Sequence, residues 1–392
     1  MTDDQIEAWA KDPHRADTMP YGLYEPPHRK GITGAALVVR GVLYFRNGFT
    51  PEVRKALVSC FEQYSSVIEE YHHAAEIAAG QQTSKTGPLR WFYTEGEDPI
   101  AYDQAPGFAR LAKTVPANQT LAVAMTSAEH KLATGFYDFT AFALSDWKAE
   151  RKRGLDGVAF TVPRAFLVHR PARFQAMFNV FAEALPTVHG HAGFAVNVPP
   201  MGRRPNEASE YFYARRFGPG IDVGDPMRSN IRKLYTKIKT VDWLNALDAE
   251  LVREVGGSSS LALPPDWFIR EPLGNGGLII QAGAAPETGI SDGPGKPVLP
   301  PAAYVLLNQA LRPIVTDTLD TLQDGTLDST APLLNTVVAT EGWLRRLNIP
   351  EDQINVWWVE LHKTRKVTDE RPAIEDLTQK LRDRMRLSRP SA

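Results

Sequence analysis

Apolar and polar positions follow two different periods along the chain, which predicts both strands and helices. Residues 35–45 are a nearly continuous run of β-forming side chains that stops at Asn47-Gly48, as expected for a buried strand. Thr50 then offers a hydroxyl cap and Pro51 suits a first turn, so a helix should begin here. The apolar positions that follow recur every three or four residues and form one stripe: Val53, Leu57, Phe61, Tyr64 and Ile68.

Similar patterns continue to the end of the chain. Further strands are expected at 89–94, 121–126, 136–144, 158–168, 192–198 and 276–283. Further helices are expected at 170–185, 207–217, 241–255, 302–322 and 333–347, after Pro350, and over 374–387. Together these elements predict an α+β fold in which an antiparallel or mixed sheet is flanked by helices.

Three of the expected elements carry further signals. In 136–144 both alternating sets of side chains are largely apolar, which places that strand inside the sheet. Asn206 is expected to cap the helix that follows it. Gly256 and Gly257 should end the helix over 241–255 in a left-handed conformation.

Composition divides the chain into three regions. Residues 1–31 are rich in Pro, His and charge and predict an irregular lead-in. Residues 32–320 contain the strands and are expected to form the α+β domain, whereas 321–392 should form a helical C-terminal extension. The order strand, proline-containing turn, helix, strand occurs at 35–94 and again at 158–198, which leaves open a fold of two pseudo-repeated halves.

The composition is typical of a globular protein inside the cell, with 43% hydrophobic and 23% charged residues. No stretch approaches the roughly 18 apolar residues of a membrane helix, and the acidic start of the chain does not resemble a secretory signal. The single cysteine, Cys60, lies in a helical pattern and is expected to be a buried thiol. We therefore expect a cytoplasmic protein that does not associate with a membrane.

The charge of the chain does not indicate binding to nucleic acid. A formal net charge of −2 gives no general attraction for nucleic acid. Residues 1–150 contain 14 Lys and Arg against 19 Asp and Glu, a balance of −5, which fits a basic partner although a solvated surface gives the same count. One cluster of carboxylates follows the aromatic strand at 89–94, and it consists of Glu95, Glu97 and Asp98 with Asp103 close behind.

Histidines offer the strongest argument for a metal site. His189 and His191 alternate on an expected strand, so they point the same way and could share an ion. A third ligand is not evident, and the adjacent His72 and His73 cannot both face one ion. We therefore predict no metal site and no cofactor.

Other catalytic motifs are also lacking. The glycine-rich residues 274–277 precede a strand and lack the Lys and Ser or Thr of a phosphate loop. The Gly-x-Ser-x-Gly motif of serine hydrolases does not occur, and Ser258, Ser259 and Ser260 have the composition of a turn. The chain is therefore predicted not to be an enzyme.

Several blocks in the middle of the chain resemble a known family. The blocks are 216–222 (RFGPGID), 238–245 (IKTVDWLN), Gly256-Gly257, 278–283 (LIIQAG), Pro286 and Gly289. Their order and spacing, over roughly residues 35–315, resemble the TsiV-like family of type VI secretion immunity proteins, formerly a family of unknown function. The resemblance implies an inhibitor that binds a co-encoded effector and protects the producing cell, and it implies no catalytic residues.

The resulting prediction is an immunity protein that neutralises a cognate type VI secreted toxin by occluding the toxin's active or substrate site. If the toxin is a nuclease, its basic groove should attract Glu95, Glu97, Asp98 and Asp103, which are the predicted partner-binding residues. Two alternatives stay open, namely an adaptor that loads an effector onto the secretion apparatus and a metal-dependent hydrolase.

Overall fold

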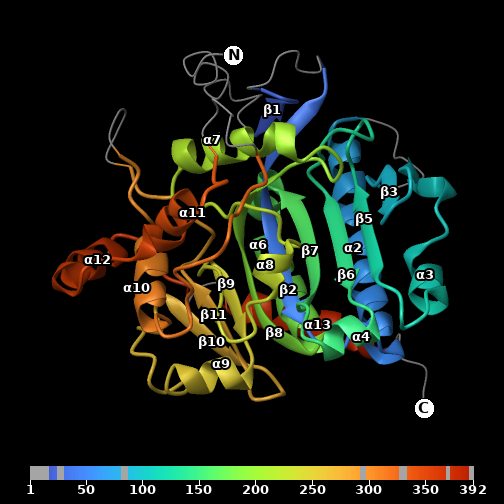
Figure 1. Ribbon diagram of the computed structural model, residues 1–392. Helices are drawn as coiled ribbons and strands as arrows, with labels where there is room; N and C mark the ends of the chain where they lie inside the picture. Colours follow the sequence, from blue (N-terminus) through green and yellow to red (C-terminus); the bar gives the residue numbers. More distant parts are fainter. Residues whose placement is uncertain are drawn as a thin grey trace.

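One antiparallel sheet forms the centre of the computed structural model, which describes residues 17–23, 31–80, 87–291, 297–325, 333–367 and 371–387 (Figure 1). Its strands are β1 (Thr18–Pro20), β2 (Thr33–Phe45), β3 (Trp91–Thr94), β4 (Ile100–Ala101), β5 (Leu121–Thr126), β6 (Asp138–Ala143), β7 (Asp156–Pro163), β8 (Thr187–Asn197), β9 (Leu244–Leu247), β10 (Phe268–Pro272) and β11 (Leu278–Ala282). They lie in the order β10-β11-β9-β8-β2-β7-β6-β5-β3-β4, with β1 paired to β2. The predicted α+β class is confirmed, and β6 lies inside the sheet as expected.

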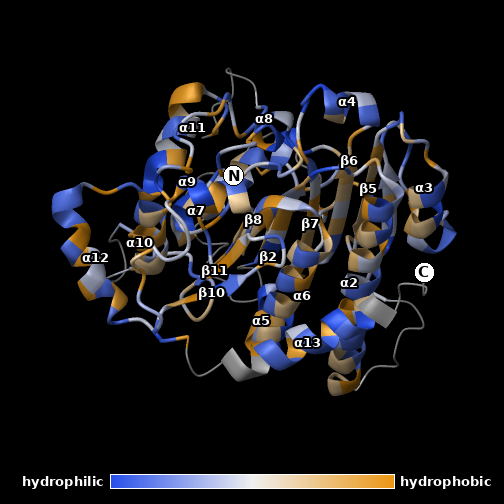
Figure 2. Ribbon diagram, turned by 90° about the horizontal axis from the view of Figure 1, so that it is seen from below, coloured by the Kyte–Doolittle hydropathy of each residue, from blue (hydrophilic) through white to orange (hydrophobic). Residues whose placement is uncertain are grey.

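Helices lie on both sides of this sheet (Figure 2). They are α2 (Pro51–Ala78), α3 (Phe108–Thr114), α4 (Asp146–Glu150), α5 (Arg164–His169), α6 (Pro171–Ala184), α7 (Glu207–Phe217), α8 (Ser229–Arg232), α9 (Ala249–Glu254), α10 (Ala302–Ala310), α11 (Val337–Leu344), α12 (Ile354–Leu361) and α13 (Arg371–Leu387). Short 3-10 turns are η1 (Tyr102–Gln104), η2 (Arg204–Asn206), η3 (Arg345–Leu347) and η4 (Glu351–Gln353). Figure 2 shows α2, α5, α6 and α13 on one side of the strands and α4, α7 and α8 on the other. In the described parts of the chain, no helix has both the length and the apolar character needed to span a membrane.

The first strand and helix form as the sequence predicts. The Thr50 side chain accepts a hydrogen bond from the Val53 amide at 3.4 Å and so caps α2. The apolar stripe of α2 packs on the sheet, where Tyr64 contacts the rings of Phe139 in β6 and Phe160 in β7. This contact places α2 on the sheet face to which Phe139 and Phe160 point.

The segment 241–255 is not one helix, so that prediction is wrong. Its first part forms β9 between β8 and β11, and only Ala249–Glu254 is helical. The residues of β9 are all buried because the sheet is covered on both sides here, and an apolar run of this length fits a strand or a helix equally well. The predicted end is confirmed, since Gly256 and Gly257 have φ of 84° and 89°.

Three smaller expectations also need correction. The helix expected over 302–322 is shorter, since α10 ends at Ala310 and the residues after it form turns and loop. The strand expected over 158–168 ends at Pro163, which has no amide hydrogen to extend the ladder, and the next residues form α5. Asn206 does not cap α7. Its side chain instead accepts a hydrogen bond from the Gly22 amide at 2.9 Å and donates one to the Gly202 carbonyl at 3.0 Å.

The two ends of the described chain pack onto the same body. The helical character expected after residue 320 is confirmed, and α13 lies along α6, where Arg382 pairs with Glu183. In the lead-in, β1 pairs with β2, while residues 1–16 and 24–30 lie outside the described residues. The boundaries at 31 and 320 and the two pseudo-repeated halves stay predictions.

The two faces of the sheet are covered unequally. Both β2 and β7 are buried almost throughout, because helices cover one face and the segment 198–243 covers the other. This second cover ends at β6. There, and in β5, the side chains that point to this face are only partly buried, namely Ala122, Ala124, Thr140 and Phe142. One strip of the sheet, over β3, β5 and β6, is therefore open.

Candidate functional site

A groove lies on this open strip of the sheet, and its volume is about 700 Å³. The strand register places Tyr93, Ala124 and Thr140 in one row across β3, β5 and β6, with Ala122 beside Phe142 in the next row. Three of these five side chains are small. They leave space above the floor of the groove. The residues between them in sequence point to the other face of the sheet, where Phe139 packs against Phe61 of α2.

Methionines form one wall of the groove. Met201 and Met227 line it together with Pro200. Met227 lies directly on β7, since a Cβ at Gly157 would stand 2.8 Å from the Met227 sulfur. Gly157 thus makes room for this side chain. Thioether side chains are flexible and polarisable, so this wall can adapt to an apolar partner group.

An acidic turn also lines the groove. Glu95, Glu97 and Asp98, which we call the acidic rim, lie exposed between β3 and β4 and line the groove. Within the described residues they form no ion pair, and the groove lining includes no Lys, Arg or His. The fourth predicted residue, Asp103, is exposed on η1 and does not line the groove. The structure thus brings three of the four predicted carboxylates together beside one cavity.

The groove continues into a smaller inner recess of about 190 Å³. Groove and recess share the lining residues Ala124, Thr140, Pro200 and Met227. The recess also contains Asp138, whose Oδ2 accepts a hydrogen bond from Asn197 at 3.0 Å. Burial raises the pKa of Asp138 to about 7, although a hydrogen bond from Thr126 and the charge of Arg40 act in the opposite direction. The inner end of the groove therefore holds a carboxyl group that is partly protonated at neutral pH.

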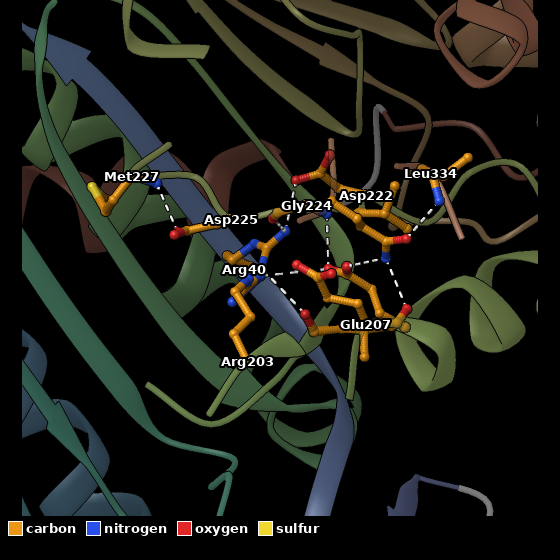
Figure 3. A network of polar contacts seen from close by, with 12 residues as sticks. Arg40, Arg203, Glu207, Asp222, Gly224, Asp225, Met227 and Leu334 are labelled. Atoms are coloured by element: carbon orange, nitrogen blue, oxygen red, sulfur yellow. Dashed lines mark hydrogen bonds and ion pairs between the residues drawn. The ribbon is translucent and has the colours of Figure 1, made fainter. Parts of the chain in front are cut away.

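Behind the recess lies a buried charge network around Asp222 (Figure 3). Arg40 from β2 contacts Asp222 Oδ2 at 2.9 Å, Lys239 contacts Oδ1 at 2.5 Å, and His191 from β8 contacts Oδ2 at 3.1 Å. All four side chains are 4% exposed or less. Burial alone would raise the pKa of Asp222, but Lys239, His191 and Arg40 together hold it well below its usual value. Asp222 is thus a stable anion that neutralises buried cations from separate elements.

Glu210 extends the network toward the C-terminal helices. Its carboxylate accepts hydrogen bonds from the Gly224 amide at 2.8 Å and from the Gln323 side chain at 2.7 Å. Gln323 in turn accepts one from the Leu334 amide at 2.7 Å (Figure 3). Because the same short segment carries Asp222, Gly224 and Met227, the network helps to fix the position of Met227 in the wall of the groove.

The sequence interpretation did not identify this network, although one signal for it exists. Arg40 interrupts the apolar run 35–45, and Lys239 stands between the apolar Ile238 and the buried Thr240. A charge at such a position indicates a buried partner, because an unpaired charge is very costly to bury. No local pattern, however, connects Arg40 to Asp222, which lies 182 residues away.

The histidines considered as metal ligands make other contacts in the structure. His189 and His191 lie two residues apart on β8, but His189 contacts the Leu234 carbonyl at 2.9 Å while His191 contacts Asp222. Burial lowers the pKa of both, to about 3 for His189. His72 pairs with Glu76 at 3.2 Å. Across the described ranges, no group of three His, Cys, Asp or Glu side chains is placed to hold a metal ion.

Comparison with known proteins adds the family to this geometry. A family model described as TsiV, type VI immunity for VRR-NUC, matches residues 56–347. The chain belongs to the TsiV family. The resemblance expected from the sequence blocks is confirmed, and the match to the TsiV model extends to residue 347, beyond the region of those blocks.

A solved structure supports the same assignment. The Pseudomonas aeruginosa T6SS protein PA0821 is similar to this TsiV family member with a TM-score of 0.80 and 29% sequence identity, over 93% of this chain and 96% of that one. No curated protein matches the chain.

Proposed function

We propose that this TsiV family member neutralises a cognate type VI secreted toxin by covering the toxin's active or substrate site. The family match carries the proposal, because the family description assigns type VI immunity and names VRR-NUC. Occlusion needs only a complementary surface, with a typical buried area of roughly 1,200–2,000 Å². The protein therefore acts without making or breaking a bond in its own cavities.

The chemistry of the acidic rim supports a nuclease as the partner. A nuclease holds the phosphates of its substrate with Lys and Arg side chains, and carboxylates on an inhibitor compete for the same cations. Glu95, Glu97 and Asp98 are exposed and lack an ion-pair partner in the described chain, and Asp103 follows on η1. These four residues are the proposed contact with the toxin.

The proposed place of action is the cytoplasm, where a nuclease toxin meets nucleic acid. Cell fractionation with an antibody against the native protein tests this point. Recovery of the protein in the periplasm would contradict it.

Growth rescue tests the proposed function directly. The toxin encoded beside this gene is expressed in a sensitive host with and without the protein, and we expect the protein to restore growth and to co-purify with the toxin. An adaptor would bind the toxin and leave it active, so binding without rescue would refute immunity. Turnover of a substrate by the isolated protein would refute inhibition by occlusion alone.

Charge reversal tests the contact residues. Replacing Glu95, Glu97, Asp98 and Asp103 together with Lys should weaken affinity at least tenfold and reduce its dependence on salt, since ionic contacts across the interface become repulsive. A control replaces three exposed carboxylates elsewhere with Lys, namely Asp320 in a loop and Glu351 and Asp352 on η4. Unchanged affinity and salt dependence in the first variant would remove its four positions from the interface.

A further inference from the structure

We infer that the groove over β3, β5 and β6 receives one projecting segment of the toxin, in which a Lys or Arg side chain is flanked by apolar side chains. This inference rests on the proposed function. It adds the part of the surface that is used and the chemistry of the segment that enters it.

Charge selects a basic segment. Three carboxylates line the groove and no basic side chain does, so the groove attracts a cation at its acidic rim. The rim carboxylates are exposed and unpaired within the described chain. They can therefore reorient toward an arriving cation without breaking an internal ion pair.

The apolar part of the lining selects the neighbours of that cation. Ala122, Ala124 and Phe142 on the floor and Met201 and Met227 on the wall present carbon and sulfur atoms to the cavity. Met201 is 39% exposed, so its side chain is accessible to a partner segment that enters the groove. The volume of about 700 Å³ is that of a cavity for a few side chains and not for a whole domain.

The inner recess can hold the charged end of the segment. Asp138 and Asp225 both line it. The two arginines that line it already face other carboxylates, since Arg40 pairs with Asp222 at 2.9 Å and Arg203 lies 3.7 Å from Glu210. A Lys or Arg that enters along the groove would therefore meet the carboxyl group of Asp138 at its inner end.

The walls are held in place before binding. Met227 follows the segment that the buried network fixes through Asp222 and Gly224, and the floor belongs to the central sheet. A preformed site avoids part of the entropy cost of ordering loops on association. This is a property expected of an inhibitor that has to act before its toxin does damage.

Filling the groove is the first test. In Ala124→Phe the phenyl ring projects from β5 into the groove and fills part of it. We expect the affinity for a catalytically inactivated form of the toxin to fall at least tenfold. Ala74→Phe, on an exposed position of α2, is the matched control and should bind within twofold of wild type. Thermal melting of both variants reports whether they fold like the wild type.

Crosslinking identifies the occupant even if a groove-filled variant folds poorly. The native thiol of Cys60 is buried, so in Met201→Cys a photoreactive maleimide labels the groove alone. We expect one crosslinked toxin peptide that contains Lys or Arg beside apolar residues. The same label at Ala74→Cys should give no crosslink to that peptide.

The possible results separate this inference from the proposed function. If wild type rescues growth but Ala124→Phe binds equally well, or if the crosslinked peptide has no basic residue, the groove inference is wrong and immunity stands. If wild type neither binds nor rescues, both fail. If the isolated chain self-associates and Ala124→Phe abolishes this, the occupant is a second copy and the inference is overturned.

Discussion

Replacing Asp222 with Asn tests whether the buried network holds the fold together. The substitution keeps the shape of the side chain and removes its charge. Arg40 at 2.9 Å and Lys239 at 2.5 Å then lose the anion that neutralises them. Both cations are 4% exposed or less, so water cannot replace the carboxylate without local opening.

The expected loss follows from these distances. At 2.5 to 2.9 Å each ion pair has a Coulomb energy of about 6 kcal/mol at an effective dielectric constant of about 20, and desolvation offsets much of it. Breaking a buried ion pair typically costs about 3–5 kcal/mol. Because one substitution leaves two cations unpaired, we expect the free energy of unfolding to fall by about 4 kcal/mol, which is roughly a thousandfold in the unfolding equilibrium.

Urea unfolding followed by tryptophan fluorescence measures this loss. Asp320→Asn, at an exposed carboxylate, is the control and should change stability by less than about 0.5 kcal/mol. Adding Lys239→Met to Asp222→Asn removes one unpaired cation and should restore part of the stability. A loss below about 1 kcal/mol for Asp222→Asn would refute the reasoning, because it would mean that the cations do not depend on this carboxylate.

Three further predictions follow from other buried groups. Gly193→Ala should lower the free energy of unfolding, measured by urea titration, by about 1–3 kcal/mol, because a Cβ at this position collides with the buried carboxylate of Asp242. Burial lowers the pKa of His189 to about 3. The unfolded chain therefore takes up a proton at His189 below a pKa of about 6.5 while the folded protein does not, so stability is lost as the pH falls below about 6.5. Between pH 7 and pH 5, the free energy of unfolding measured by urea titration should fall by about 2 kcal/mol more in the wild type than in His189→Gln. Cys60 should react with a thiol reagent only in denaturant, because burial raises its pKa and excludes the reagent; rapid labelling of the native protein would contradict this.

The sequence correctly predicted those strands and helices whose apolar pattern and capping residues lie within a short stretch of the chain. The run 35–45 and the cap at Thr50 gave β2 and α2, and β5 occupies the predicted residues 121–126. The segment 241–255 could not be resolved in this way. Its apolar residues are buried because β8 and β11 pair on either side of β9, and that pairing is a long-range fact absent from the local sequence.

The candidate site shows the same limit. A cluster of carboxylates after an aromatic strand indicated Glu95, Glu97 and Asp98, and the structure places them beside one groove. The groove itself exists because the cover over the second face stops between β7 and β6, which depends on how the segment 198–243 packs on the sheet. Likewise, Arg40 was visible as a charge in an apolar run, but its partner Asp222 was not.

The alternation of side chains in β5 and β6 separates the positions that line the groove from those that build the core. Val123 and Phe139 point toward the helices and contribute to the core, whereas Ala122, Ala124 and Thr140 point into the groove. Substitutions in the outward set change the lining of the groove without removing the core contacts on the opposite face of the sheet. Lineages of such a protein can thus diversify what they recognise on two strands whose other side stays constant.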